Sequence, residues 1–544
     1  MLPDLAAMSS TSFQITATTG AFPLEAGTIF TNTVEVNTTL LGDDPSNNVA
    51  ETAATVFPLL YIHEIQGSGD SNTMPGAIVN IEAIVVGDFQ DNDGDLFDTD
   101  LDGFYVQEEL ADYDNDKSTS EGLFVYAPGA TDVAVGDLVC LTGEVGEYSD
   151  QTQLTLQGDL KICGHATLPA PVSLTLPVRD ISDFERYEGM LVSFPQALVI
   201  SEYYNYDRYN EVVLAEPFVD ERPFQPSAYL DPTTEADAID DAASLIARSR
   251  ITLDDARSAQ NPPLLRHPNG APYALDNRFR GGDMVQDATG VLGQGFGIYR
   301  LQPTVAATYI EENPRPDASP AVGGSVQVGA FNVLNYFLTL DDGSDICGPN
   351  LDMECRGADT PQEFDRQRAK ILAALEEIEA DVFGLVELEN TTGVTPTADL
   401  VAGLNDTLGA GTYAHIETGT IGGDAIKVGL IYKASTVTPL GDFVVLDDPA
   451  FLDPNNTGVP KNRAALVQTF QDNRSGETFT VVVNHLKSKG SDCGGAPDDD
   501  PVQGNCNLTR AMAADYLVDW LSTNPTGTGT GNNLIIGDLN AYDK

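Results

Sequence analysis

Short apolar segments separated by turns rich in glycine and aspartate run through the first part of this chain, and they constrain its fold more than any other feature. Segments such as GFYVQEE and GLFVYAP have the length and composition of strands, and they recur at regular intervals. Regular spacing of this kind is typical of small all-β barrels and sandwiches. We therefore expect an all-β region, with a small barrel at residues 58–165 and a β-rich extension of it at residues 166–312.

Residues 1–57 also read as strands. The stretch TIFTNTVEVNTTLLGDDPSNNVAETAATV alternates apolar and polar residues around the turn GDDPSNN, which predicts a hairpin. It resembles the closing hairpin of an immunoglobulin-like β-sandwich repeat, and it contains too few strands for a whole sandwich. We expect residues 1–57 to be a remnant of such a repeat, so that the chain begins inside a domain.

The pattern changes after residues 313–325, which are rich in proline and glycine and read as a linker. The sequence TPQEFDRQRAKILAALEEIEA predicts an amphipathic helix with Thr360 as N-cap, Pro361 at the first helical position and Glu363 completing a capping box. Its expected apolar face consists of Phe364, Ile371, Leu372, Leu375 and Ile378. The strand patterns DVFGLVE, IKVGLIY, FTVVVNH and NLIIGD follow, with a second helix near residues 508–521, so residues 326–544 should form an α+β layered domain.

The charge of the chain limits how it could hold a polyanion. Acidic residues number 83 against 27 lysines and arginines, which gives a formal net charge of −56. Broad electrostatic attraction to nucleic acid normally needs a basic footprint, so such a substrate would have to be held by metal ions and a few local cations. No apolar run is long enough to span a bilayer, and the first residues show no secretion signal.

Six cysteines make an even set, and none forms a CxxC metal-binding pair. Three candidate pairs close polar loops: Cys140 with Cys163, Cys347 with Cys355, and Cys493 with Cys506. Six unrelated buried thiols are the alternative. We favour three disulfides, and with them an oxidising, extracellular compartment.

Polar residues follow the apolar strands of the last domain where each strand ends. VGAF is followed by Asn332, FGLV leads to Glu387, TVVVN leads to His485, and LIIG leads to Asp538 and Asn540. Strand ends of a layered sheet are where such architectures gather their sites. Carboxylates suit a hard divalent ion such as Mg²⁺, and a histidine can exchange a proton near neutral pH. Taken singly, each of these residues is as well explained by a turn or a solvent-facing position.

The motifs around these residues occur in a fixed order: FNVLNYF, DVFGLVELEN, DAIKVGLIYK, KNRAALVQTF, VVVNHLKSKG and IIGDLNAYD. Together they resemble the endonuclease/exonuclease/phosphatase superfamily, which includes secreted multidomain nucleases. The resemblance covers residues 326–544 and implies an α+β two-layer β-sandwich. A looser resemblance, carried by IHEIQGSG, GFYVQEE, TSEGLFVY and VGDLVCLTGEVGEY, makes residues 58–165 similar to the OB-fold domain of such nucleases.

The resemblance also implies roles for single residues. Glu387 matches the metal-binding glutamate, since its spacing fits better than that of nearby Glu389, and Asn332 matches the asparagine that supports the metal–phosphate site. Asp538, a second metal ligand, and Asn540 match the pair that positions water and phosphate, and His485 matches a histidine that contacts the scissile phosphate. Further cations for phosphate are Arg463, Lys487 and Lys489, although solvated surface charge explains these three equally well. The implied cofactor is Mg²⁺ or Mn²⁺.

One family feature is not found in the sequence. The family has a later Asp-His motif that supplies a second histidine, and no histidine follows GDLNAYDK here. We therefore expect a C-terminally incomplete domain, and a chain that is an inactive or weakly active fragment of a longer protein.

A second possible ion site lies in the segment DTDLDGFYVQEE. Asp98, Asp100, Asp102 and Glu109 satisfy a calcium-loop spacing, but no amphipathic helices flank them. An acidic hairpin in an acidic protein explains the pattern as well as a structural Ca²⁺ does.

These observations predict an extracellular, metal-dependent nuclease that hydrolyses phosphodiester bonds of DNA, and possibly of RNA. Two alternatives remain open: a phosphoesterase of the same fold that acts on phospholipid or sugar phosphate, and a non-catalytic extracellular binding protein. The expected partner is a nucleic acid substrate. We expect no membrane span in the chain, and no protein partner can be inferred.

Overall fold

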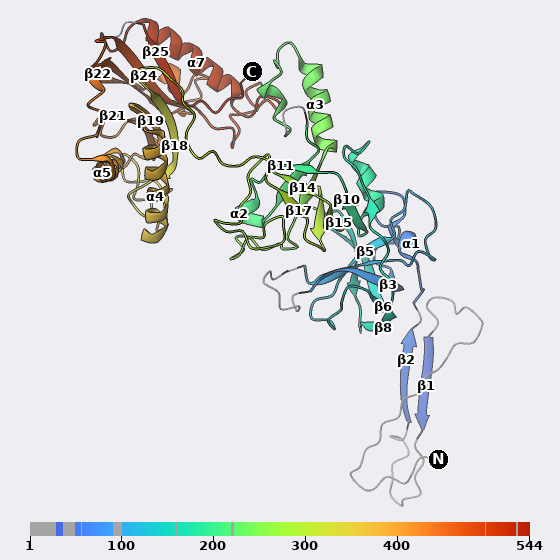
Figure 1. The fold of residues 1–544 in the computed structure, drawn as a ribbon. Helices are drawn as coiled ribbons and strands as arrows, with labels where there is room; N and C mark the ends of the chain where they lie inside the picture. Colours follow the sequence, from blue (N-terminus) through green and yellow to red (C-terminus); the bar gives the residue numbers. More distant parts are fainter. Residues whose placement is uncertain are drawn as a thin grey trace, which may run out of the picture. The chain divides into compact units, whose positions relative to one another are not determined.

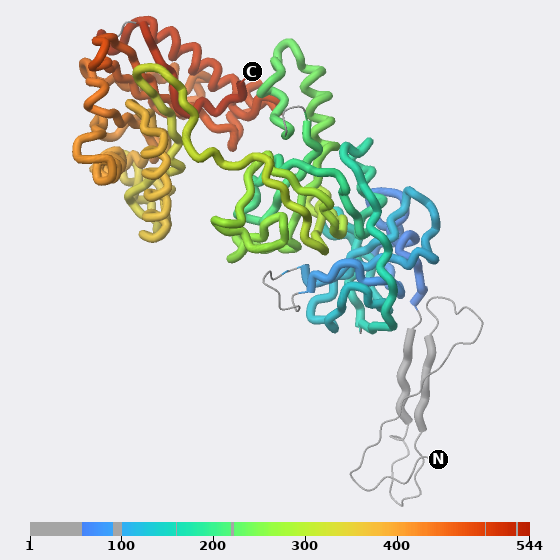
Figure 2. Tube along the Cα trace, viewed as in Figure 1, coloured from blue at the N-terminus to red at the C-terminus, as the bar shows by residue number. Residues whose placement is uncertain are grey.

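The structure is a computed structural model that describes residues 29–35, 49–55, 57–90, 99, 101–158, 160–218, 222–495, 497–528 and 531–543. The chain divides into two compact units (Figures 1 and 2). The N-terminal unit takes in the chain up to Pro223 together with Ser244–Pro314, and the C-terminal unit combines Phe224–Ala243 with Arg315–Lys544. Residues 224–243, expected within the β-rich extension, are thus grouped with the C-terminal unit.

The first two strands form a hairpin-like pair. β1 (Ile29–Glu35) and β2 (Val49–Thr55) are antiparallel, with Ile29 opposite Thr55 and Glu35 opposite Val49. The remaining positions in 1–56 lie outside the described residues, so the expected sandwich remnant stays a prediction.

A closed ring of strands follows, preceded by the short helix α1 (Ile62–Gln66). Its strands are β3 (Ile78–Phe89), β4 (Gly103–Gln107), β5 (Gly122–Tyr126), β6 (Asp137–Tyr148), β7 (Gln151–Leu156) and β8 (Lys161–His165). The order is β3-β4-β5-β7-β6-β8, and β3 also pairs with β6, so five strands close on themselves while β8 extends β6. Neighbours are antiparallel except for β5 and β7. Buried side chains such as Ile81, Phe104 and Val125 fill the inside of the ring.

The rest of the N-terminal unit is one nine-stranded sheet of order β17-β14-β11-β12-β13-β16-β15-β10-β9. The strands are β9 (Val172–Ser173), β10 (Leu191–Phe194), β11 (Leu198–Glu202), β12 (Val212–Ala215), β13 (Arg250–Leu253), β14 (Met284–Gln286), β15 (Ala288–Gly295), β16 (Ile298–Pro303) and β17 (Thr308–Ile310). Between them in the chain lie the helical elements η2 (Ile181–Tyr187), α2 (Tyr206–Tyr209), η3 (Pro226–Ala228) and α3 (Ala236–Arg248). Of these, η3 and the part of α3 up to Ala243 are grouped with the C-terminal unit. Most pairs are antiparallel, and β9–β10 and β13–β16 are parallel.

Two four-stranded sheets form the centre of the C-terminal unit (Figure 1). The first has the order β18-β19-β21-β20, from β18 (Val328–Tyr336), β19 (Val382–Glu389), β20 (Tyr413–His415) and β21 (Ile426–Lys433). The second has the order β22-β23-β24-β25, from β22 (Val437–Leu446), β23 (Ala465–Asp472), β24 (Thr478–His485) and β25 (Asn533–Asp538). The helices are α4 (Pro361–Ile378), α5 (Pro396–Leu408), α6 (Pro449–Leu452) and α7 (Asn507–Ser522).

Three buried clusters show that these elements form layers. Val386 and Val428 of the first sheet pack with Leu466 and Val483 of the second, so the two sheets lie face to face. On the outer side of the first sheet, residues of α4 and α5 pack against β18, β19 and β21. On the outer side of the second sheet, residues of α6 and α7 pack against β22, β23 and β24. The layered α+β domain expected from the strand and helix patterns is therefore observed as helix–sheet–sheet–helix.

The predicted amphipathic helix is confirmed as α4. The Thr360 hydroxyl oxygen accepts a hydrogen bond from the Glu363 amide, and the Glu363 carboxylate accepts one from the Thr360 amide, which satisfies two amide donors of the first turn. All five residues of the predicted apolar face belong to the cluster under this helix. The second predicted helix is confirmed as α7.

The three disulfides expected from the cysteine spacing are formed: Cys140–Cys163, Cys347–Cys355 and Cys493–Cys506. They tie down polar loops in both units. Among the described residues, no helix combines the length and the apolar character needed to cross a membrane.

Candidate active site

Two pairs of parallel strands bring the predicted polar residues together. β18 runs parallel to β19 in the first sheet, with Asn332 opposite Val386, and β24 runs parallel to β25 in the second sheet, with His485 opposite Asp538. Because the two sheets pack face to face, the C-terminal ends of these four strands meet at one edge of the sandwich.

At this edge three side chains form what we call the strand-end trio: Glu387, His485 and Asp538. One potential ligand atom from each lies within 4.8 Å of the others. Asn332 links the two carboxylates, since its Nδ2 donates to Glu387 Oε1 at 2.9 Å and to Asp538 Oδ2 at 3.4 Å. The structure thus brings together four residues that are up to 206 positions apart in sequence.

The backbone at Glu387 is bent to place its side chain. Glu387 has a φ of +66° and lies where the pairing of β19 with β21 shifts register between Leu385 and Leu388. A left-handed conformation is unfavourable for glutamate, and bulges of this kind commonly re-aim a side chain next to a site. The amide of Asn335, itself at a φ of +53°, donates to Glu387 Oε2 at 3.0 Å and holds the carboxylate in place.

Glu389, two residues further along β19, has a different environment. It is fully buried, and its carboxylate accepts hydrogen bonds from the amides of Leu338 and Thr339 and from the Thr339 hydroxyl. These donors satisfy the buried carboxyl oxygens within the fold, so Glu389 holds the chain after β18 in place. The geometry therefore favours Glu387 over Glu389 as the site residue.

The turn after β25 fixes Asp538 and Asn540. The Asn540 amide donates to Asp538 Oδ1 at 2.9 Å, and its side-chain Nδ2 donates to the carbonyl of Leu486 at 3.1 Å. Just before Asp538, Gly537 has a φ of +116°, and a Cβ added there would lie 2.0 Å from the carbonyl oxygen of Asn484. Only glycine allows this close approach of β25 to β24, and with it the placement of Asp538.

His485 is the buried member of the trio, with 3% of its surface exposed. Its Nδ1 atom has no hydrogen-bond partner within the described residues. Burial, followed by the nearby positive charge of Arg463, lowers the pKa of His485 to about 4, against the opposite influence of Asp538, Glu387 and Asp424. The imidazole is therefore neutral at neutral pH, and it can donate from one nitrogen and accept with the other.

Three predicted phosphate cations lie around this edge, and an acidic residue that sequence reasoning missed orients one of them. Arg463 Nε donates to Asp424 Oδ2 at 2.8 Å, while Arg356 Nη2 donates to Asp424 Oδ1 at 3.1 Å. The Nη1 atom of Arg463 is buried and has no hydrogen-bond partner in the described part of the chain. No local pattern marks Asp424, because its role depends on contacts with residues 39 and 68 positions away.

The two predicted lysines are held by neighbouring polar groups. Lys487 Nζ donates to Ser491 Oγ at 2.8 Å, and Lys489 Nζ donates to the carbonyl of Asn540 at 2.8 Å. Burial, together with other nearby cations such as Arg510, lowers the pKa of both lysines. Lys489 is thus tied to the turn that carries Asp538 and Asn540.

The strand-end trio fits a hard divalent cation. Two carboxylates whose oxygens lie this close repel each other unless a positive charge lies between them. Carboxylate oxygens, with a neutral imidazole beside them, are suitable ligands for Mg²⁺ or Mn²⁺. The donor set therefore agrees with the cofactor expected from the sequence.

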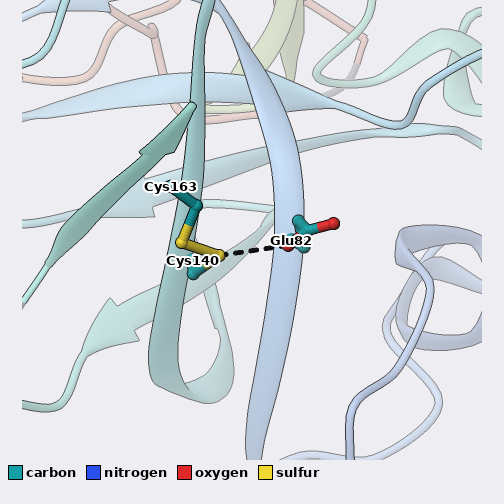
Figure 3. Close-up of side chains that lie close together, drawn as sticks. All are labelled: Glu82, Cys140 and Cys163. Carbon is teal, nitrogen blue, oxygen red and sulfur yellow. Dashed lines mark hydrogen bonds between the residues drawn. A yellow bond between two sulfur atoms is a disulfide. The ribbon is translucent and has the colours of Figure 1, made fainter. Parts of the chain in front are cut away.

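Other groups of potential ligands lie in the N-terminal unit. Figure 3 shows Glu82 beside Cys140 and Cys163, which are joined in a disulfide. The Glu82 carboxylate lies 3.2 Å from the Sγ of Cys140. Since metal binding needs thiolates, this group is not a metal site in the oxidised protein. Two further groups lie next to the barrel: His63 with Asp114 and Glu121, and Glu108 with Glu109 and Asp112.

Part of the possible calcium loop cannot be placed. Asp98 and Asp100 lie outside the described residues. Asp102 has a φ of +53° immediately before β4, and Glu109 belongs to the group with Glu108 and Asp112. The calcium site stays a prediction.

Comparisons with known proteins give a loose likeness. No family model matches the chain, and no curated protein matches it. Among solved structures it is similar to an endonuclease/exonuclease/phosphatase from Bacteroides vulgatus, at 17% identity over 40% of this chain and 66% of that chain, with a TM-score of 0.24. It is also similar to the catalytic domain of human Nocturnin with a bound sulfate anion, at 16% identity over 33% of this chain and 58% of that chain, with a TM-score of 0.23.

A third similar structure is a mannosyl-6-phosphatase from Bacteroides thetaiotaomicron, at 14% identity over 32% of this chain and 57% of that chain, with a TM-score of 0.23. All three matches span less than two thirds of the matched protein. At such TM-scores the likeness carries no argument about function, so the assignment has to rest on the site itself.

Proposed function

We propose that the C-terminal unit is a metal-dependent phosphodiesterase that hydrolyses nucleic acid, DNA in the first place, outside the cell. The observation that carries this proposal is the convergence of Asn332, Glu387, His485 and Asp538 at one edge of two packed sheets. A structural role alone does not explain two adjacent carboxylates beside a buried histidine nitrogen that has no hydrogen-bond partner within the described ranges.

Each residue has a defined task in this proposal. A divalent cation held by Glu387 and Asp538 would supply positive charge to the phosphate oxygens and to the leaving oxygen. Asn332 holds the two carboxylates near each other through its Nδ2 atom, which donates to both. Neutral His485 donates a hydrogen bond to a phosphate oxygen from its buried position.

The surrounding groups orient the phosphate. Arg463 is fixed through Nε by Asp424, which leaves its buried Nη1 to bind a phosphate oxygen. The backbone amide of Asn540 donates to Asp538, which keeps Asn540 next to this carboxylate. From there Asn540 can position the phosphate and the attacking water. Lys487 and Lys489 add positive charge at this edge.

Two features outside the site support nucleic acid as substrate and an extracellular location. The ring order β3-β4-β5-β7-β6, closing on β3 with one parallel pair, agrees with the five-stranded Greek-key barrel of the OB-fold, whose members bind oligonucleotides. Three disulfides suit an oxidising compartment.

The test combines metal binding with cleavage. Mn²⁺ binding is measured by calorimetry, and supercoiled plasmid is incubated with Mg²⁺ or Mn²⁺ and, in parallel, with EDTA. Turnover is expected to be slow, because the trio offers one histidine for proton transfer. Glu387→Gln should lose both metal binding and nicking, whereas Glu377→Gln, on the exposed side of α4, should keep both.

Assays with other substrates distinguish the nuclease from a phosphoesterase that acts on phospholipid or sugar phosphate. Phospholipid vesicles and a sugar phosphate are assayed with the same enzyme. Faster hydrolysis of a phosphodiester bond in the phospholipid, or faster release of phosphate from the sugar phosphate, than nicking of DNA would replace the nuclease assignment. Nicking that persists in EDTA or in Glu387→Gln would refute metal-dependent hydrolysis at this site.

A further inference from the structure

An exposed aromatic surface on the nine-stranded sheet has no role in the proposed hydrolysis. Tyr203 and Tyr204 follow β11, and 47% and 85% of their surfaces are exposed. Tyr273, from the segment between β13 and β14, is 39% exposed. A contiguous exposed aromatic surface often marks an interaction site.

Tyr203 and Tyr273 belong to one ring cluster, and Tyr204 is the residue that follows Tyr203 in the chain. Phe279 is its centre, with ring centroids 5.7 Å from Tyr203, 4.8 Å from Tyr206 and 5.8 Å from Tyr273. Tyr206 and Tyr273 also contact each other edge to face at 5.4 Å. The cluster therefore fixes the rings of Tyr203 and Tyr273 in position, so these two rings would lose little side-chain entropy when a flat ligand stacks on them.

Two exposed arginines lie in the same chain segments as these tyrosines. Arg208 on α2 lies over the Tyr209 ring at 5.2 Å and donates to Gln260 Oε1, and Arg278 directly precedes Phe279. Both side chains are exposed, and neither forms an ion pair among the residues that the structure describes. The segment 257–280 contains four arginines and one acidic residue, in a chain whose net charge is −56.

We propose that Tyr203, Tyr204, Tyr273, Arg208 and Arg278, the tyrosine–arginine patch, bind single-stranded nucleic acid. Exposed bases stack on tyrosine rings, and arginines contact the phosphates between them, whereas a duplex keeps its bases covered. Asp207 and Asp276 lie in the same segments, so stacking contributes more to binding than charge does. The barrel lacks such a surface in its sequence, and the adjoining sheet provides it.

This binding is separate from hydrolysis and is measured without it. The full chain is titrated into a fluorescein-labelled oligothymidylate in EDTA at about 50 mM salt, and anisotropy is followed. The Glu387→Gln variant should bind as the parent does. If patch-dependent binding is found while cleavage is absent, this inference stands and the proposed function falls.

Tyr204→Ala is the decisive variant, because its side chain is almost fully exposed and its loss leaves the ring cluster intact. Stacking on one ring predicts a fall in affinity of about tenfold. Tyr148→Ala, which removes a tyrosine of the barrel that is 65% exposed, is the matched control and should bind as the parent does. Arg278→Ala should weaken binding less and lower the slope of log K against log salt by about 0.7.

The substrate arms complete the test. An abasic oligonucleotide should bind at least about tenfold more weakly than oligothymidylate, because it offers no rings to stack. Equal affinity for the abasic strand, unchanged binding by Tyr204→Ala, or tighter binding to a duplex than to the single strand would each overturn the proposal.

Discussion

Two groups of side chains in this protein place a histidine and two carboxylates within 4.8 Å of one another, and they are built in different ways. The strand-end trio takes Glu387, His485 and Asp538 from three strands in two sheets. The second group, the barrel trio, takes His63 from α1 and Asp114 and Glu121 from the loop between β4 and β5.

The difference lies in how far each group is satisfied by its own surroundings. In the barrel trio, His63 Nδ1 pairs with Glu121 Oε2 at 2.9 Å, and Glu121 Oε1 accepts from the Asp114 amide at 3.2 Å. In the strand-end trio, Glu387 accepts from Asn332 and from the Asn335 amide, and Asp538 accepts from Asn332 and from the Asn540 amide. His485 Nδ1 is buried and has no hydrogen-bond partner among the residues that the structure describes. Closeness of potential ligands and hydrogen-bonded carboxylates are common to both, whereas the unmet hydrogen-bonding capacity of His485 Nδ1 distinguishes the strand-end trio as the candidate site.

The largest expected effect is on plasmid nicking, which should depend on the strand-end trio and not on the barrel trio. Asp538→Asn should reduce metal-dependent plasmid nicking by about 10³-fold, because it removes a ligand charge worth several kcal/mol to the transition state. Asp114→Asn, the same substitution in the barrel trio, should change the rate by less than about twofold. Equal losses in the two variants would show that the distinction drawn here is wrong.

The next effect concerns the backbone that positions the strand-end trio. Gly537→Ala should lower the free energy of unfolding by about 3 kcal/mol or more, because the new Cβ would collide with the Asn484 carbonyl at a positive φ. Gly490→Ala has nothing within 4 Å of its added Cβ and should cost less than about 1 kcal/mol. Urea unfolding measures both, and a stable Gly537→Ala variant would contradict the close approach of β25 to β24.

The third expected effect is a pH dependence of stability caused by Glu108, a buried carboxyl group near the barrel trio. Burial raises the pKa of Glu108 to about 8, with Glu121, Asp112 and Glu109 adding to the rise. Between the unfolded value near 4.5 and this value, the folded state binds the extra proton, so its stability falls as pH rises. From pH 6 to pH 7.5 the loss should be about 2 kcal/mol.

Thermal unfolding across this pH range measures that slope. Glu108→Gln should flatten it, while Glu144→Gln, an exposed change in β6, should leave it as in the parent. If the free energy of unfolding of the parent and of Glu108→Gln changed with pH by the same amount in this window, Glu108 would not be protonated in the folded state.

The smallest expected effect is the stabilisation of the fold by metal. Mn²⁺ at about ten times its dissociation constant should raise the free energy of unfolding by about 1.4 kcal/mol. The rise should disappear in Asp538→Asn and persist in Glu121→Gln. Calorimetric scans with and without Mn²⁺ measure this stabilisation. If only Glu121→Gln lost it, the ion would be bound by the barrel trio.

The comparison also explains what sequence reasoning could reach. Asn332, Glu387, His485 and Asp538 each end an apolar strand, and strand ends are local features of a sequence. Helix α4 was predictable from Thr360 to Ile378 because caps and apolar periodicity are local too. Asp424 and Arg356 escaped prediction because their contacts with Arg463 and with each other join distant loops.

The same reason limits the prediction of the N-terminal unit. Strand patterns indicated an all-β region, but the parallel pairings β9–β10 and β13–β16 follow from long-range packing that no local pattern encodes. The ring cluster around Phe279 likewise joins residues from separate segments, so the tyrosine–arginine patch is visible only in the fold. The segment 224–243 shows no sequence signal for its grouping with residues 315–544.

That grouping has a consequence for modularity. The Ser227 hydroxyl and the Gln225 side-chain amide both donate to the Val502 carbonyl, so part of the C-terminal unit is encoded upstream of the last strands of the N-terminal unit. A single cut in the gene therefore cannot excise either unit intact. Recombination that transplants residues 315–544 alone would leave these contacts behind, and the two units are expected to be inherited together.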